Sequence, residues 1–143
     1  MSEEYYPEIP QGWEVLYSQM MEDIAALGFE DFEWLQVKEK FGEMRCYTAE
    51  NDEELNDIIT KYEVMASFVC AKCGKPAVVR TWRYILPYCE ECYDSSRHGE
   101  VERERPIWFR TEIVLRNLSD MTTRTLDFGD EWERYLERIG YDK

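Results

Sequence analysis

The sequence predicts an α+β fold: two helices and a β-hairpin, then a zinc ribbon with four cysteine ligands, then a C-terminal strand-plus-helix extension. Three observations predict it, namely apolar residues at helical spacing, short aromatic-rich runs typical of strands, and two Cys-x-x-Cys pairs between them. With 143 residues and 44% hydrophobic side chains, the chain can bury one core. We expect an acidic α+β domain over 1–69, a zinc ribbon over 70–94 and a β/α extension over 107–143, packed as one globule.

Helical spacing marks two segments before the cysteines. Apolar side chains recur at helical spacing from Trp13 onwards, and Gly28 is a residue type that commonly ends a helix. Farther along, Asn51 followed by Glu54 resembles a capping box, and apolar residues then recur as far as Ala66. Both segments are therefore predicted to be amphipathic helices.

Strand signals lie between these helices and again between the cysteine pairs. Residues 32–37 and 43–48 are rich in aromatic residues, and a hairpin is the natural connection between them. In its turn we expect Gly42 to supply a positive φ and Phe41 to fill the core. Residues 77–86 are dense in β-branched and aromatic side chains, as expected for the strands of a zinc ribbon.

The sequence after the second cysteine pair predicts a connector and a separate β/α piece. Residues 95–106 are charged and poor in helix signals, so we expect a linker there. Apolar and polar residues alternate over 107–116, which predicts a strand, and 122–128 resembles a second one. A final helix is expected to start with Asp130 as its cap and to end at Gly140.

The four cysteines of the ribbon predict one structural zinc ion. Cys70 and Cys73 form one pair, Cys89 and Cys92 form the other, and both have the two-residue spacing of a metal knuckle. Gly74 permits the left-handed backbone that such a knuckle needs. Four thiolates fill a tetrahedral site and leave no position for water or substrate, so the ion is expected to fasten the fold and not to catalyse.

Two other interpretations of these cysteines fit the sequence less well. Disulfides need an oxidising compartment, whereas the chain starts with neither a basic segment nor an apolar signal region, so we expect a cytoplasmic protein with reduced thiols. A zinc deaminase needs Pro directly before its cysteine pair and His-x-Glu upstream. Here Tyr88 separates Pro87 from Cys89, and His98, the one histidine, lies downstream.

Negative charge is the second strong signal, because 31 acidic and 17 basic side chains give a net charge of −14. Residues 1–67 hold most of the excess, with 17 acidic and 4 basic groups. One interpretation is a surface that engages a basic protein partner, with carboxylates in the places where the phosphates of a nucleic acid would lie. The other is that the charge only keeps the protein soluble, which explains it equally well. The candidate partner-binding residues are Glu50, Asp52, Glu53, Glu54 and Asp57. No apolar run is long enough to cross a membrane.

Nucleic-acid binding is an alternative that depends on arginine and aromatic residues in the ribbon. The candidates are Arg80, Trp82, Arg83 and Tyr84, which could stack on bases. The simpler interpretation is that these rings cover the metal and dock the ribbon. The overall acidity also disfavours extended contact with phosphates.

An enzyme is the least supported class. Cys46 has no histidine nearby in sequence and is predicted to be a buried strand residue, while His98 lies in a charged loop. The sequence contains no phosphate-binding Gly-rich loop and no nucleophile elbow. We therefore expect a non-enzymatic protein whose partner and oligomeric state the sequence leaves open.

Residues 36–47 carry the most distinctive motif, Gln-Val-Lys-Glu-Lys-Phe-Gly-Glu-Met-Arg-Cys-Tyr. Together with the Gly-Trp at residues 12–13 and the following Cys-x-x-Cys-Gly, it resembles a family of small uncharacterised bacterial and phage zinc-ribbon proteins. The resemblance covers about residues 12–92 and implies a phage or mobile-element setting, without naming an activity. In such a setting, the acidic surface could occupy the nucleic-acid groove of a host complex and inhibit it. Within the motif, Lys38, Lys40 and Arg45 are either a solvated loop or a local basic contact.

Overall fold

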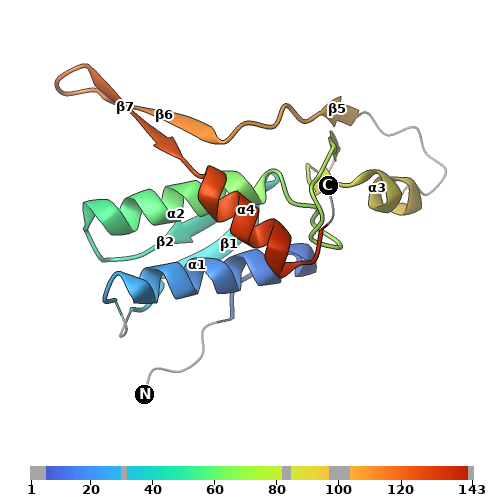
Figure 1. The fold of residues 1–143 in the computed structure, drawn as a ribbon, viewed down its shortest axis with the longest axis horizontal. Coiled ribbons are helices and arrows are strands. Elements are labelled where there is room, and N and C mark those ends of the chain that lie inside the picture. The colour runs from blue at the N-terminus through green and yellow to red at the C-terminus, as the bar shows by residue number, and fades with distance from the viewer. Residues whose placement is uncertain (1–5, 30–31, 82–84, 97–103, 142–143) are drawn as a thin grey trace.

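The structure, a computed structural model, describes residues 6–29, 32–81, 85–96 and 104–141. This part of the chain combines helices with small antiparallel sheets, so the predicted α+β class is confirmed. Figure 1 shows α1, α2 and α4 grouped together, with the cysteine ribbon and α3 at one end of the molecule. In chain order the elements are the 3₁₀ turn η1 (Gln11–Trp13), α1 (Glu14–Ala26), β1 (Gln36–Lys40), β2 (Glu43–Tyr47), α2 (Glu53–Ala66), β3 (Val79–Thr81), β4 (Pro87–Tyr88), α3 (Glu90–Ser96), β5 (Glu104–Pro106), β6 (Glu112–Asn117), β7 (Thr122–Asp127) and α4 (Gly129–Arg138).

The main core lies where α1, α2 and the β1–β2 hairpin meet. Its apolar side chains come from the periodic positions of both helices, so the helical spacing in the sequence predicted the buried faces correctly. The large apolar side chains with no exposed surface here include Trp13, Leu16, Met20, Ile24, Val37, Met44, Leu55, Tyr62 and Met65. The cap of α2 differs from the prediction, because Asp52 and not Asn51 is the N-cap, and its Oδ1 accepts the amide of Leu55 at 3.0 Å.

The hairpin forms as predicted, but its first strand starts later. Strand β1 begins at Gln36 and pairs with β2 so that Val37 lies opposite Cys46. The expected strand at 32–37 is therefore wrong over most of its length. Its aromatic residues pack on each other in a loop instead, with the rings of Phe32 and Trp34 edge to face at 4.6 Å.

The turn of this hairpin corrects the prediction for Phe41. Gly42 has the expected positive φ of 78°, but Phe41 also lies in the left-handed region, with φ 55°. A two-residue turn with both residues left-handed directs its first side chain away from the sheet. The ring of Phe41 is accordingly 62% exposed, and the Nζ of Lys40 lies 5.6 Å from its centre. Val37 and Met44 fill the core at this position.

The ribbon holds a strand that the sequence did not predict. Its sheet has the order β4-β3-β5, in which Arg80 of β3 lies opposite Pro87 on one side and Arg105 on the other. The predicted linker at 95–106 is therefore wrong at both ends, since α3 extends to Ser96 and β5 begins at Glu104. Strand β5 covers an edge of β3 that would otherwise expose unpaired backbone groups.

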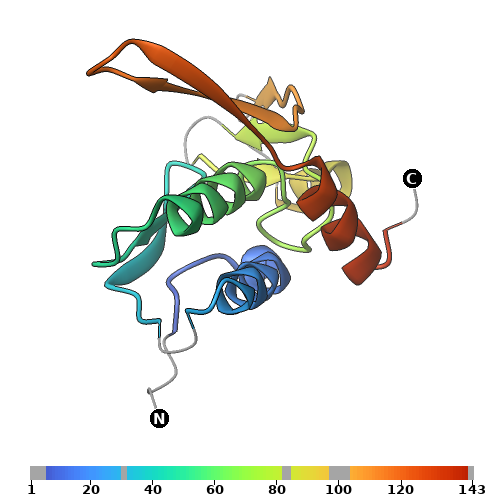
Figure 2. The same ribbon diagram turned by 60° about the vertical axis from the view of Figure 1, so that its left-hand side comes forward.

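The C-terminal part combines a projecting hairpin with a docked helix. Figures 1 and 2 both show β6–β7 extending away from the body of the molecule. Strand β6 runs over Glu112–Asn117, so the strand predicted at 107–116 is wrong over residues 107–111. The expected capping by Asp130 is also wrong, because α4 begins at Gly129, whose amide donates to the Oδ1 of Asp127 at 2.7 Å.

Helix α4 joins the two earlier helices. The Nε2 of Gln19 in α1 donates to the carbonyl of Glu131 at 2.9 Å, and Lys61 of α2 pairs with the carboxylate of Glu131 at 2.9 Å. Further ion pairs connect Arg134 to Asp23 at 2.8 Å and Arg138 to Glu22 at 2.6 Å. Among the described residues, no helix combines the length and the apolar character needed to span a membrane.

Candidate metal centre

The four predicted ligands come together at one point of the ribbon. The Sγ atoms of Cys70, Cys73, Cys89 and Cys92 all lie within 4.8 Å of one another, and those of Cys73 and Cys89 are 3.6 Å apart. Metal–sulfur bonds of about 2.3 Å in a tetrahedron place the sulfurs about 3.8 Å apart, whereas a disulfide needs about 2.05 Å. The quartet therefore matches the spacing of a site that could hold one metal ion, and all its cysteines are free thiols.

The first cysteine pair lies on a tight backbone turn. The amide of Cys70 donates to the carbonyl of Lys75 at 2.7 Å, and the amide of Gly74 donates back to the carbonyl of Cys70 at 3.1 Å. Gly74 has a φ of 86°, as the sequence predicted. This turn points both thiols of the pair toward the second pair.

The second pair is held at the junction of a strand and a helix. Cys89 directly follows β4, and Cys92 lies in the first turn of α3. The amide of Ala71 donates to the carbonyl of Pro87 at 2.9 Å, which ties the first knuckle to the strand leading into the second. The relative position of the two pairs is thus fixed by a backbone hydrogen bond, and the four sulfurs are held where one ion could bind them all.

The knuckles are also docked on the core, through contacts that the sequence analysis did not predict. The amide of Gly12 donates to the carbonyl of Ala71 at 2.8 Å, and the indole Nε1 of Trp13 donates to the carbonyl of Val69 at 2.9 Å. From the other side, the hydroxyl of Tyr135 in α4 donates to the carbonyl of Gly74. The Gly-Trp pair before the first helix was the available signal for this contact.

Burial and mutual proximity shift the pKa values of cysteines in the quartet in different directions. Burial acts to raise the pKa of Cys70, but backbone hydrogen bonds to its thiol outweigh it and lower this pKa. Burial and hydrogen bonds among the thiols raise the pKa of Cys92 well above its ordinary value, and burial raises the pKa of Cys73. Four thiolates this close would repel each other, and a divalent cation removes that penalty. The donor set is all sulfur, which suits zinc or iron, and it has no open position for a substrate.

The five predicted partner-binding carboxylates divide into two groups. Asp52 caps α2, and Asp57 forms two hydrogen bonds of 2.7 and 2.9 Å with the guanidinium of Arg124 in β7. Glu50, Glu53 and Glu54 are exposed, although Glu53 also lies 3.8 Å from Arg124. Three of the five side chains are therefore directed to solvent, and two stabilise the fold.

The residues predicted for nucleic-acid binding are only partly described. Arg80 is half-buried on β3, and its Nη2 donates to the carbonyl of Ser67 at 3.4 Å. Trp82, Arg83 and Tyr84 lie outside the described residues, as does His98. Contact of these aromatic side chains with bases stays a prediction.

The three basic residues of the hairpin lie on one face of its strands, because Lys38 is opposite Arg45 and two residues from Lys40. A contact with a partner there stays a prediction. Lys38 and Arg45 lie opposite each other across the two strands and are half-buried, while Lys40 is exposed at the turn. Cys46 is half-buried beside them, and its backbone amide donates to Oε2 of Glu63 at 2.9 Å. Burial, together with the charge of Glu63, raises the pKa of the Cys46 thiol far above neutrality, so this thiol stays protonated.

Comparisons with protein-family models, with curated proteins and with solved structures gave no match to this chain. The resemblance of residues 12–92 to small zinc-ribbon proteins therefore stays a prediction. The function has to be inferred from the geometry of the chain itself.

Proposed function

We propose that this chain is a non-enzymatic binding module, built around one structural zinc ion, that docks on a protein partner with a basic surface. One observation carries the proposal: the projecting β6–β7 hairpin presents exposed apolar side chains next to the acidic start of α2. This end of the molecule, formed by β6–β7 and residues 50–57, is called the acidic arm below. The cysteine quartet supports the same proposal, because a closed site fastens the fold and performs no chemistry.

The hairpin of the acidic arm has the features of a contact element. Val114, Leu118 and Met121 are 69%, 79% and 66% exposed, which is a high exposure for three apolar side chains on one short hairpin. A two-stranded hairpin is only marginally stable in water unless it packs on something else. In this chain it is linked to α2 by the pair between Arg124 and Asp57.

The start of α2 adds the charge that selects the partner. Glu50, Glu53 and Glu54 are exposed there, and carboxylates in the first turn of a helix are stabilised by the helix dipole. Exposed carboxylates at fixed positions attract a surface that normally binds phosphates. In the phage setting implied by the sequence resemblance, the partner would be a host nucleic-acid-binding complex that the chain inhibits.

Zinc is the proposed ion because it prefers four thiolates in a tetrahedron. Native mass spectrometry of the reduced protein should find one zinc per chain, and Cys70→Ser should lose it. Iron in place of zinc, or no bound metal, would contradict this part of the proposal.

Two variants that each remove three negative charges, from different parts of the surface, test the partner contact. The zinc-loaded chain, immobilised, is used to capture proteins from host lysate, and each captured protein is then purified and titrated. We expect a basic partner that binds the variant E50Q/E53Q/E54Q at least tenfold more weakly. The control E14Q/E33Q/E137Q removes the same charge from exposed sites elsewhere and should bind like the wild type. Equal loss in both variants, or no loss in either, would refute a role for the acidic arm.

A further inference from the structure

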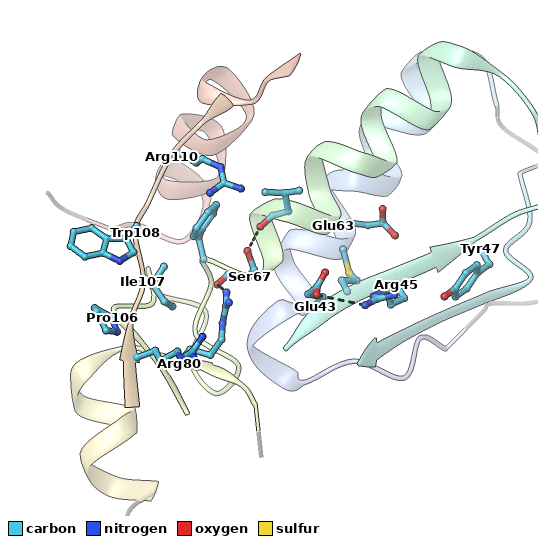
Figure 3. A pocket seen from close by; sticks show the side chains of 14 residues that line it. Glu43, Arg45, Tyr47, Glu63, Ser67, Arg80, Pro106, Ile107, Trp108 and Arg110 are labelled. Atoms are coloured by element: carbon cyan, nitrogen blue, oxygen red, sulfur yellow. Dashed lines mark hydrogen bonds and ion pairs between the residues drawn. The ribbon is translucent and has the colours of Figure 1, made fainter. Parts of the chain in front are cut away.

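A groove lies between the β1–β2 hairpin and strand β5, which forms one edge of the ribbon sheet. It has a volume of about 810 Å³ and is open to solvent on one side. Figure 3 shows its two walls, with Glu43, Arg45 and Glu63 on the side of β2 and α2, and with Arg80 and Arg110 on the side of the ribbon. We call it the arginine groove.

The groove concentrates positive charge in an acidic protein. Its lining includes Arg45, Arg80, Arg105 and Arg110, which are four of the 17 basic side chains in a chain with net charge −14. They come from β2, β3, β5 and the segment after β5, so the fold brings together residues that are far apart in the sequence. Like charges gathered in this way repel each other unless an anion lies among them.

The two carboxylates that line the groove do not neutralise the positive charge of its arginines. Glu43 lies 3.6 Å from the Nη2 of Arg45, which is a long ion pair. Glu63 accepts the backbone amide of Cys46 and is largely buried, and its burial raises the pKa of this carboxyl. The acidic residues therefore position Arg45 and the strand edge but leave the ribbon wall without a carboxylate among the lining residues.

Several guanidinium donors in the groove have no acceptor in the described part of the chain. The Nε atoms of Arg45 and Arg80 are buried without a hydrogen-bond partner. Arg110 is exposed and makes no hydrogen bond or ion pair with the described residues. An unpaired buried donor costs about 1–3 kcal/mol, and guanidinium groups suit phosphate oxygens because they bind them in pairs.

The size of the groove and the rings at its ends define the rest of the ligand. Ligand sites of small molecules span about 300–1,000 Å³, and the groove falls within this range. The ring of Tyr47 at one end is 44% exposed and that of Trp108 at the other is 81% exposed, so a planar base has a surface on which to stack. A long nucleic acid would run from the groove onto the acidic surface, which repels it.

We propose that the arginine groove binds a nucleotide, with its phosphates between the guanidinium groups of Arg80 and Arg110 and its base against an exposed ring. The groove lies apart from the metal ligands, and nucleotide binding there does not depend on the proposed partner contact. Loss of protein binding and loss of nucleotide binding are therefore separate results.

The test is calorimetric titration of the full zinc-loaded chain at about 50 mM NaCl with ADP, pyrophosphate, adenosine and a short oligo-dT. We expect ADP to bind, pyrophosphate to bind more weakly, adenosine to give no heat, and the ADP affinity to fall as salt rises. R80Q and R110Q should each weaken ADP binding about tenfold or more, because each removes a charge-assisted contact to phosphate. R116Q removes the same charge from the exposed face of β6 and should bind ADP like the wild type.

Four results would overturn the proposal. They are no ADP binding at millimolar concentration, equal ADP affinity in R110Q and R116Q, pyrophosphate binding as tight as that of ADP, and binding of oligo-dT alone. The second result is decisive even if R80Q is destabilised, because Arg110 is exposed and R110Q should keep the thermal midpoint of the wild type.

Discussion

Replacing Gly12 with alanine is expected to destabilise the whole protein through the metal knuckle. A Cβ at this position would lie 2.0 Å from the carbonyl oxygen of Cys70 and 2.6 Å from the carbonyl carbon of Ala71. Both are backbone atoms of the first knuckle, so no flexible side chain can move aside. The turn η1 must therefore separate from the knuckle by about an ångström or more.

The cost follows from the contacts that this movement breaks. Overpacking typically costs about 1–3 kcal/mol, and the hydrogen bonds from Gly12 to Ala71 and from Trp13 to Val69 contribute about 1 kcal/mol each. The sum is about 3–5 kcal/mol, a large part of a typical domain stability of about 5–15 kcal/mol. At about 3 °C per kcal/mol, the thermal midpoint should fall by roughly 10–15 °C.

Urea denaturation of the zinc-loaded protein measures this change, and Gly28→Ala is the matched control. Gly28 has a φ of 105°, but a Cβ there meets nothing within 4 Å, so the substitution costs only backbone strain of about 1–2 kcal/mol. Gly12→Ala should therefore unfold at a lower urea concentration than Gly28→Ala. Equal midpoints for the two variants would refute the close contact between η1 and the knuckle.

Two further predictions concern the metal and the pH dependence. Removing the metal with a chelator should melt the knuckles, because metal binding in small sites contributes about 10–16 kcal/mol. In hydrogen-exchange measurements, the amide of Ala71 should then lose its protection, whereas the amides of α1 should keep theirs. Retained protection at Ala71 would contradict this prediction. Burial acts to raise the pKa of Asp23, but hydrogen bonds from Arg134 and Tyr62 outweigh it and lower the pKa below its ordinary value of 3.8. A lowered carboxyl pKa stabilises the fold above the unfolded pKa, and this stability is lost as pH falls through the folded pKa. The difference in unfolding free energy between wild type and Asp23→Asn should therefore shrink below about pH 4. A difference that does not change with pH would show that the carboxylate does not act through its charge.

The sequence predicted the features that depend on local spacing. Helices α1, α2 and α4 follow the 3.6-residue period of their apolar residues, and each ends within two residues of the predicted position. The ligands within each knuckle are also neighbours in sequence, so their pairing was readable before the fold was known. The turn at Gly42 was predicted for the same reason.

Features that depend on distant contacts were missed. Phe41 was expected in the core because it is apolar, but the left-handed turn directs it outward. Strand β5 has three residues and no periodic signal, and it exists because β3 provides a partner. Asp57 was assigned to a partner surface, whereas Arg124, which lies 67 residues away, pairs with it in the fold. The arginine groove was invisible for the same reason, since it is assembled from four separate segments.

The contacts of α4 with α1 have a consequence for synthesis. Glu22 and Asp23 meet their arginine partners 116 and 111 residues later, and the Gly74 turn receives the hydroxyl of a tyrosine 61 residues downstream. A ribosome therefore has to release residues 129–138 before the first helix can complete its native neighbourhood. Until then the emerging polypeptide leaves Glu22 and Asp23 without their arginines, although the apolar side of α1 can already pack on α2 and on the β1–β2 hairpin. The last step of folding is therefore the attachment of a late helix to a subdomain whose core has already formed.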